Sequence, residues 1–181
     1  MFLTAMMMQF YIINYMYLNW IPSRFAVVRL RQFSRHPSQS ITTMSTIPGV
    51  DDMNKLEHKT LVTEPHGLTY SYYLSPDFTK KLDSSVPTLV FLHGFPDDAY
   101  MWAGAVPHML KLPCPFILVD ILGLGDSSKP TDASLFNYRK QANSIAQILD
   151  REKVPNNVIP IGHDWGSRRQ MAVSFLVEHS S

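Results

Sequence analysis

The stretch NNVIPIGHDWGSRRQ, residues 156–170, decides the fold of this chain. It begins as a short apolar run and ends in GHDWG, residues 162–166, where a carboxylate stands between two glycines. This pattern is typical of a nucleophile elbow, the tight turn that joins a buried strand to a helix. Glycine on either side removes Cβ clashes, and the amides that begin the following helix favour an anion. The pattern therefore predicts that Asp164 is ionised and stands alone above a sheet.

Other apolar runs upstream of this turn predict further strands. TLVFLHG (88–94), FILVD (116–120) and NNVIPIG (156–162) are short and continuously apolar, as in strands that are buried on both faces. LEHKTLVTEPHGLTYSYYLSP (56–76) favours two strands joined by a Pro-His-Gly turn. The chain is thus expected to contribute five strands to one sheet.

The segments between the apolar runs favour helices. Residues 97–112 are helical in part, with apolar side chains at a spacing of four. The clearest helix lies within residues 137–154, where one face is apolar: Tyr138, Ala142, Ile145 and Leu149. Strands alternating with helices are typical of an α/β fold with a mostly parallel sheet flanked by helices. Ligands of such sheets bind at the carboxyl ends of the strands, where the sharpest motifs lie.

The N-terminal residues differ in composition from the rest. We expect residues 1–50 to be an N-terminal extension and residues 51–181 to form a partial domain. Residues 1–22 carry no charge and are long enough to cross a bilayer, and the rest of the extension is rich in Arg and Ser and has no acid. Three interpretations stay open: a membrane anchor, a mitochondrial targeting segment, or translation that begins at Met44 or Met53.

The overall composition excludes several classes of protein. The chain has a formal net charge of +1 and no basic patch with interleaved aromatics, so we expect no nucleic-acid partner. Its histidines are scattered and no Cys/His cluster has metal-ligand spacing, so we expect neither a metal nor a cofactor. The single cysteine, Cys114, rules out an internal disulfide and fits a reducing compartment or indifference to redox conditions. We therefore predict a cytoplasmic protein, or a membrane-anchored or mitochondrial one if the N-terminal segment functions.

Three motifs in this order resemble one family. HGFP (93–96), GLGDSS (123–128) and GHDWG (162–166) each follow a predicted strand. Together they are similar to the α/β-hydrolase fold and, within it, to the epoxide hydrolases, over roughly residues 55–166. The resemblance implies a small apolar epoxide as substrate. It also implies a hydrolysis that passes through an alkyl ester on the enzyme.

The resemblance assigns roles to particular residues. Asp164 would be the nucleophile, and the backbone amides of Phe95 and Trp165 would form the oxyanion hole. His93, Gly94 and Pro96 would shape the substrate-binding loop, with Pro96 following a cis peptide, and Trp165 would also form a pocket wall. The two histidines beside glycine in these motifs are expected to be structural rather than catalytic.

Haloalkane dehalogenases are an alternative, because they share the aspartate elbow. They usually carry Asn at the position of Phe95, where its amide helps to hold the departing halide. Phe95 has no such donor, so the motif favours an epoxide hydrolase. A serine esterase would need Ser at position 164.

The last fifteen residues depart from the family pattern. Relatives continue with a lid, further strands, a catalytic acid and a distal histidine, and His179 does not match that histidine. We therefore expect an incomplete α/β-hydrolase fold and an inactive chain. Arg168 and Arg169 place two cations in the first turn of the helix, against its dipole and the core.

A second function class is a non-catalytic fragment. It would be tethered to a membrane by residues 1–22, or would associate through the open edge of the sheet at VIPIG, residues 158–162. The sequence leaves the oligomeric state undetermined.

Overall fold

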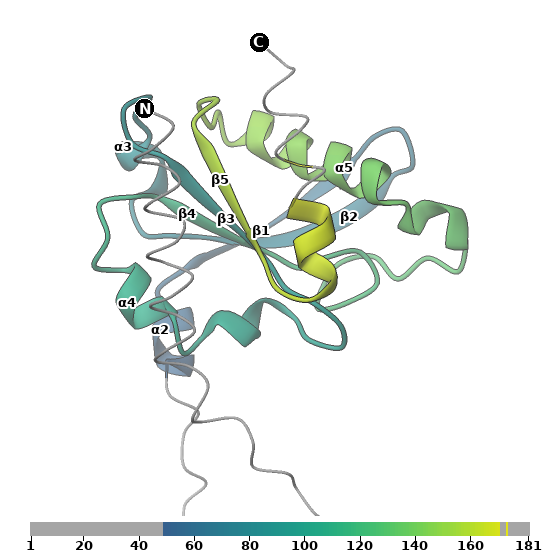
Figure 1. The fold of residues 1–181 in the computed structure, drawn as a ribbon, viewed down its shortest axis with the longest axis horizontal. Helices are drawn as coiled ribbons and strands as arrows, with labels where there is room; N and C mark the ends of the chain where they lie inside the picture. The colour runs from purple at the N-terminus through teal and green to yellow at the C-terminus, as the bar shows by residue number, and fades with distance from the viewer. Residues whose placement is uncertain (1–48, 171–172, 174–181) are drawn as a thin grey trace, which may run out of the picture. The chain divides into compact units, whose positions relative to one another are not determined.

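The computed structural model describes residues 49–170 and residue 173 (Figure 1). The predicted extension, residues 1–50, lies almost entirely outside this part, so its boundary and its three interpretations stay predictions. His179 also lies outside it. Within the described residues, no helix has both the length and the apolar character needed to span a membrane.

The elements follow the order expected from the sequence. Two strands come first, and three strands separated by helical segments follow. In chain order the elements are α2 (Val50–Met53), β1 (Glu57–Thr63), β2 (Leu68–Leu74), α3 (Phe78–Lys81), β3 (Thr88–Leu92), the 3-10 helix η2 (Ala99–Trp102), α4 (Val106–Met109), β4 (Phe116–Val119), the 3-10 helix η3 (Ala133–Phe136), α5 (Tyr138–Arg151) and β5 (Val158–Gly162).

The five strands form one mixed sheet in the order β1-β2-β4-β3-β5. β3 pairs in parallel with β4 on one side and with β5 on the other. β2 pairs antiparallel with β1 and with β4. The α/β class is confirmed, but this part of the sheet is mixed rather than mostly parallel, because the β1–β2 hairpin joins it antiparallel.

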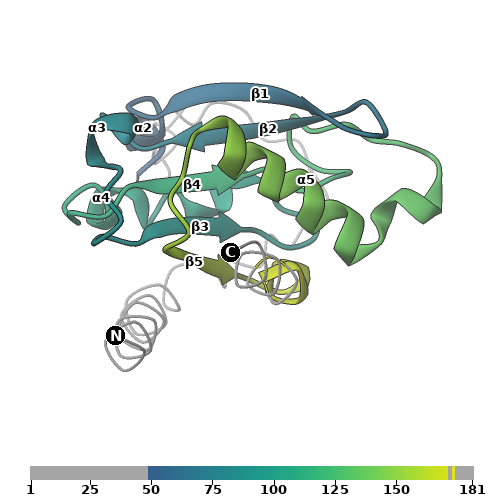
Figure 2. The same cartoon turned by 90° about the horizontal axis from the view of Figure 1, so that it is seen from above.

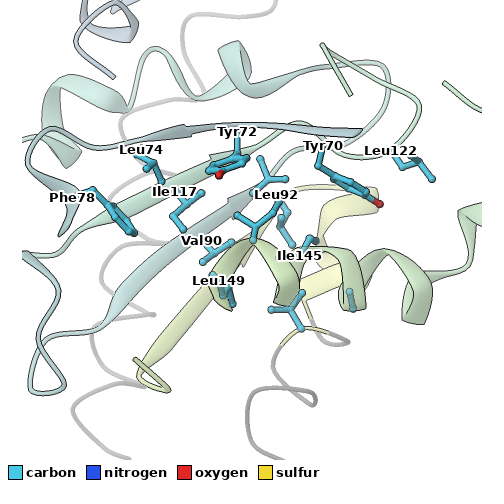
Figure 3. Close-up of a cluster of buried hydrophobic side chains, with 14 residues drawn as sticks. Tyr70, Tyr72, Leu74, Phe78, Val90, Leu92, Ile117, Leu122, Ile145 and Leu149 are labelled. Atoms are coloured by element: carbon cyan, nitrogen blue, oxygen red, sulfur yellow. The ribbon is translucent and has the colours of Figure 1, made fainter. Parts of the chain in front are cut away.

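Helix α5 covers one face of the sheet (Figure 2). Asn137 precedes the helix as its N-cap, because its side-chain oxygen accepts the backbone N–H of Arg139 at 2.9 Å. Its predicted apolar face is buried, except that Tyr138 is only partly buried. Side chains from β2, β3, β4 and α5 meet there in one cluster, which includes Tyr72, Leu74, Val90, Leu92, Ile117, Ile145 and Leu149 (Figure 3).

The opposite face of the sheet is covered by the residues between β3 and β4. Phe91 packs edge-on against Trp102 of η2, with ring centroids 5.1 Å apart, and also against Phe116. Residues 97–112 form two short elements rather than a continuous helix. Pro107 lies in the first turn of α4 because proline has no N–H to continue an earlier helix.

Strand β5 forms one edge of the described sheet, as expected. Thr88 donates its N–H to Asn157 O, and His163 donates to Leu92 O. Residues alternate in a parallel ladder, so Val158, Pro160 and Gly162 turn their backbone groups away from β3.

The backbone groups on the outer side of β5 offer few hydrogen-bond donors to a further strand. Val158 N–H donates to Asn156 O, and Gly162 N–H donates to Gln170 Oε1 at 3.0 Å. Pro160 has no N–H, and proline in an edge strand is a common protection against pairing. Among the described residues, this edge therefore presents no free N–H, which argues against association through it.

The buried face of α5 should be essential for stability. Ile145 is 0% exposed within the main cluster, so Ile145→Ala removes buried methyl groups and leaves a cavity. We expect a loss of about 2–5 kcal/mol in the free energy of unfolding, measured by urea denaturation. Asn143→Ala on the exposed face of the same helix is the control, with an expected change within about 0.5 kcal/mol. Equal effects of the two substitutions would contradict this packing.

Candidate functional site

The turn after β5 has the backbone geometry of an elbow. Asp164 has a φ of 52°, in the left-handed region that residues other than glycine rarely adopt. A helix over residues 165–170 begins immediately after it. Its first turn is closed by Gly166 N–H donating to His163 O at 2.8 Å. The strained residue is thus the predicted functional one.

Two glycines allow the backbone to pass closely at this turn. A Cβ on Gly166 would collide with the carbonyl oxygen of Leu92 and would lie 2.6 Å from that of His93. A Cβ on Gly162 would collide with the backbone of Gly166 and lie 2.6 Å from the Cα of Ser167. The sequence-based reason for these glycines is therefore confirmed by the geometry.

The Asp164 carboxylate meets the loop that follows β3. Phe95 donates its backbone N–H to Asp164 Oδ2 at 3.2 Å. The peptide bond between Phe95 and Pro96 is cis, as the resemblance implied. Gly94 is required beneath the carboxylate, because a Cβ there would lie 2.6 Å from Oδ2. The structure thus brings Asp164 together with the HGFP loop.

Hydrogen bonds to the charged form lower the pKa of Asp164. The largest cause is the backbone N–H of Trp165, and the N–H of Phe95 acts in the same direction. The positive charge of Arg169 lowers the pKa further. The Phe95 amide thus donates to this carboxylate, and the Trp165 amide favours its charged form.

His93 has both ring nitrogens engaged inside the fold. Nδ1 donates to Gly94 O at 2.8 Å, and Nε2 accepts the N–H of Ile121 at 3.0 Å. Because Nε2 accepts, the ring is neutral and its 3.9 Å separation from Asp120 Oδ1 is not an ion pair. Burial lowers the pKa of His93, which favours the same state. His93 therefore supports the loop through both of its ring nitrogens.

Asp120 is a residue that the sequence reasoning missed. It follows β4, is buried, and accepts the backbone N–H groups of Ala99 at 2.7 Å and Asp126 at 3.0 Å. It thereby ties the loop after β3 to the turn after β4. The sequence did contain an indication of this role, because Asp120 is a single acid at the end of the apolar run FILVD. That run was interpreted only as a strand.

Arg169 was expected to oppose the core at the start of the elbow helix, but it is buried there with hydrogen-bond partners. Arg168 is exposed, whereas Arg169 is 6% exposed and enters the interior with partners. Arg169 Nε donates to Gln141 Oε1 at 2.7 Å, and Nη1 donates to Trp165 O at 2.9 Å. Its guanidinium also lies 5.4 Å from the centroid of the Tyr138 ring. Arg169 thus fastens the elbow helix to α5 rather than opposing the core.

A cavity of about 470 Å³ lies beside the elbow. Phe95 and Trp165, the residues whose amides face Asp164, line it with side chains that are 67% and 51% exposed. The remaining lining comes mainly from the turn after β4 and from Arg169: Ile121, Leu122, Gly123, Leu124, Lys129, Pro130, Phe136 and Arg169. A slightly larger cavity, about 490 Å³, lies between the β1–β2 turn and α5 and does not include the elbow.

Metal ligands do not gather at the elbow. Within the described part of the chain, no group of three or more His, Cys, Asp or Glu side chains could hold a metal ion.

Comparison with known proteins identifies the fold. The family model for the alpha/beta hydrolase fold matches residues 87–169, from β3 to the elbow helix. An epoxide hydrolase from Vigna radiata has a similar structure, with a TM-score of 0.53 and 24% identity over 69% of this chain and 36% of its own. Epoxide hydrolase A from Mycobacterium thermoresistibile gives a TM-score of 0.55 and 22% identity, over 66% of this chain and 34% of its own. The chain thus has an α/β-hydrolase fold.

The chain is also similar in sequence to curated enzymes. It is 36% identical to an epoxide hydrolase of Caballeronia sordidicola over 45% of this chain and 24% of the relative. It is 27% identical to an epoxide hydrolase of Neurospora crassa over 62% of this chain and 33% of the relative. A haloalkane dehalogenase of Sphingobium indicum is 30% identical over 44% of this chain and 27% of its own length.

The chain therefore has the α/β-hydrolase fold, and its matched part is similar in sequence to curated epoxide hydrolases. The matched part spans between about a quarter and a third of the length of these curated relatives.

Gly166→Ala should damage the elbow, because the added methyl group meets the carbonyls of Leu92 and His93. We expect a loss of about 1–3 kcal/mol or more in the free energy of unfolding, measured by urea denaturation. Gly67→Ala is the control, since nothing surrounds its Cβ and only its positive φ, 61°, is unfavourable, by about 1 kcal/mol. A Gly166→Ala protein as stable as the wild type would contradict the close approach.

The pKa of Asp164 should lie below its ordinary value of 3.8. The hydrogen bonds from the two amides form only in the folded state. The charged form of Asp164 therefore stabilises the fold at any pH above the pKa of this carboxyl in the unfolded chain. This contribution is lost as the pH falls through the lower, folded pKa. A ¹³C NMR titration of aspartate carboxyls, with Asp164→Asn for assignment, measures it. A midpoint at or above 3.8 would contradict the hydrogen bonds to Trp165 and Phe95.

Proposed function

We propose that this chain carries the nucleophilic half of an epoxide hydrolase site, in which Asp164 attacks a small apolar epoxide. The main observation in support is that the backbone amides of Phe95 and Trp165 both act on the ionised, exposed carboxylate of Asp164. The similarity to curated epoxide hydrolases supports the choice of reaction.

The first step forms an ester between the enzyme and the substrate. Oδ2 accepts the Phe95 amide, which leaves Oδ1 to attack a ring carbon of the epoxide. The carbon–oxygen bond of the ring breaks with its electron pair on oxygen, and the alkoxide takes a proton from water. The apolar side chains of Phe95 and Trp165 beside the nucleophile would hold the body of the substrate.

The second step would be hydrolysis of this ester. Water attacks the ester carbonyl, negative charge develops on the former carboxylate oxygen, and the two amides stabilise it. A base must take the proton of that water. His93 cannot do so, because both of its nitrogens are engaged. We propose that this chain by itself completes the first step and stalls at the ester.

Haloalkanes are the competing substrate class, since a haloalkane dehalogenase is among the relatives. A departing halide needs donors that point at it, and Phe95 offers only its backbone N–H, which Asp164 already occupies. Phe95 therefore supplies no free donor for a halide, whereas the leaving oxygen of an epoxide stays attached to the ester product.

Incubation with styrene oxide should modify the chain once. Intact mass spectrometry is expected to find one adduct with the mass of the epoxide per chain, and peptide mapping should place it on Asp164. The rate should be constant down to about the ordinary carboxyl pKa, since the Asp164 pKa is lowered, and fall only under more acidic conditions. Asp164→Asn should abolish the adduct.

Asp126→Asn is the matched control, because Asp126 is an exposed aspartate on the turn after β4. Its adduct should form as in the wild type. Adducts spread over several carboxylates would refute Asp164 as nucleophile, and catalytic release of styrene glycol would refute the stalled ester. Faster labelling by 1-chlorobutane than by styrene oxide would favour the haloalkane alternative.

A further inference from the structure

The charges around the elbow cavity have one sign. Its lining includes two cations, Lys129 and Arg169, and no acid, while most other lining side chains are apolar. Lys129 is exposed at the rim, where its ammonium donates to the carbonyl oxygens of Gly125 and Ser127. Arg169 is the inner cation, with 6% of its surface exposed. The cavity thus combines an apolar wall with buried positive charge.

The positive charge of Arg169 is not neutralised by its hydrogen-bond partners. Gln141 and the carbonyl of Trp165 are neutral acceptors, and Tyr138 contributes only its ring. These contacts use Nε and Nη1. Among the residues that the structure describes, no carboxylate forms an ion pair with Arg169, whose hydrogen bonds run from Nε and Nη1 to neutral acceptors. A buried cation of this kind is unusual, because removal from water costs several kcal/mol unless an anion compensates.

Burial lowers the pKa of Arg169, and among the described carboxylates the charge of Asp164 acts against this shift without forming an ion pair. If Asp164 is esterified by a substrate, that compensation disappears. Arg169, which lines the cavity, then has no other carboxylate among the described residues to compensate its charge. A carboxylate on the ligand would restore the balance and would match the planar geometry of the guanidinium.

We propose that the elbow cavity binds an apolar molecule carrying one carboxylate, with Arg169 receiving the carboxylate and Phe95 and Trp165 contacting the apolar body. The claim that such a molecule is also the epoxide substrate rests on the proposed function. The binding claim does not require any reaction, so the two can fail separately.

A pair of unreactive probes with the same apolar body tests the binding. 4-Phenylbutyrate carries the carboxylate, and 4-phenylbutyramide is its neutral counterpart. Isothermal titration calorimetry on the full chain should give a Kd for the acid at least about tenfold lower than for the amide, as expected for a charged hydrogen-bonded pair. This preference should decrease as salt is raised.

Neighbouring arginines provide a matched pair of variants. Arg169→Met keeps the aliphatic stem and removes the charge, so the acid and the amide should then bind equally. Arg168→Met removes the adjacent charge, which is exposed and does not line the cavity, and should keep the tenfold preference. Because Arg169 also fastens the elbow helix, Arg169→Lys serves as a second variant that retains the charge and part of the preference.

Each outcome bears on one claim. Equal affinity for the acid and the amide in the wild type would overturn the carboxylate site, whatever the variants do. A preference that survives in Arg169→Met and is lost in Lys129→Met would move the site to the rim and overturn the role of Arg169. Selective binding of the acid without any epoxide adduct would support the site and remove the proposed reaction. An adduct on Asp164 without selective binding of the acid would support the proposed reaction and overturn the carboxylate site.

Discussion

The close passage of two backbone segments, at Gly166 and the carbonyls of Leu92 and His93, is the constraint on which the site depends. The parallel pairing of β3 with β5 brings the carboxyl ends of the two strands side by side. His163 N–H then continues the ladder by donating to Leu92 O, directly before the chain turns at Asp164. A side chain at position 166 would separate the two loops, and the Phe95 amide would no longer reach the carboxylate.

Each loop is in turn supported by buried polar groups. His93 bridges Gly94 O and the N–H of Ile121, and so joins the end of β3 to the end of β4. Asp120 extends this support by accepting amides from residues on both sides. These groups are buried and satisfied, which gives the loops a single arrangement at little net cost. The exposed carboxylate and aromatic rings of the site therefore stand on a rigid frame.

The elbow helix is held against α5 by a buried arginine. Arg169, the fifth residue of the helix over residues 165–170, is buried against Gln141 and Tyr138 of α5. The contact orients Trp165, whose carbonyl accepts from Arg169 and whose ring stacks on Tyr138 with centroids 6.4 Å apart. Nucleophile, pocket wall and buried charge are thus parts of one small assembly at the edge of the sheet.

Local sequence determined the strands, the helix over residues 138–151 and the elbow, because apolar periodicity and paired glycines act over a few residues. The resemblance of the HGFP and GHDWG motifs pointed to the Phe95 amide, which donates to Asp164 in the fold. Only the tertiary structure decided the strand order, the antiparallel entry of β1 and β2, and the protection of the β5 edge by Gln170 and Pro160. It alone also decided that Asp120 supports two loops and that Arg169 is buried. The physical reason is that these outcomes depend on contacts between residues far apart in the chain, whose partners local patterns do not specify.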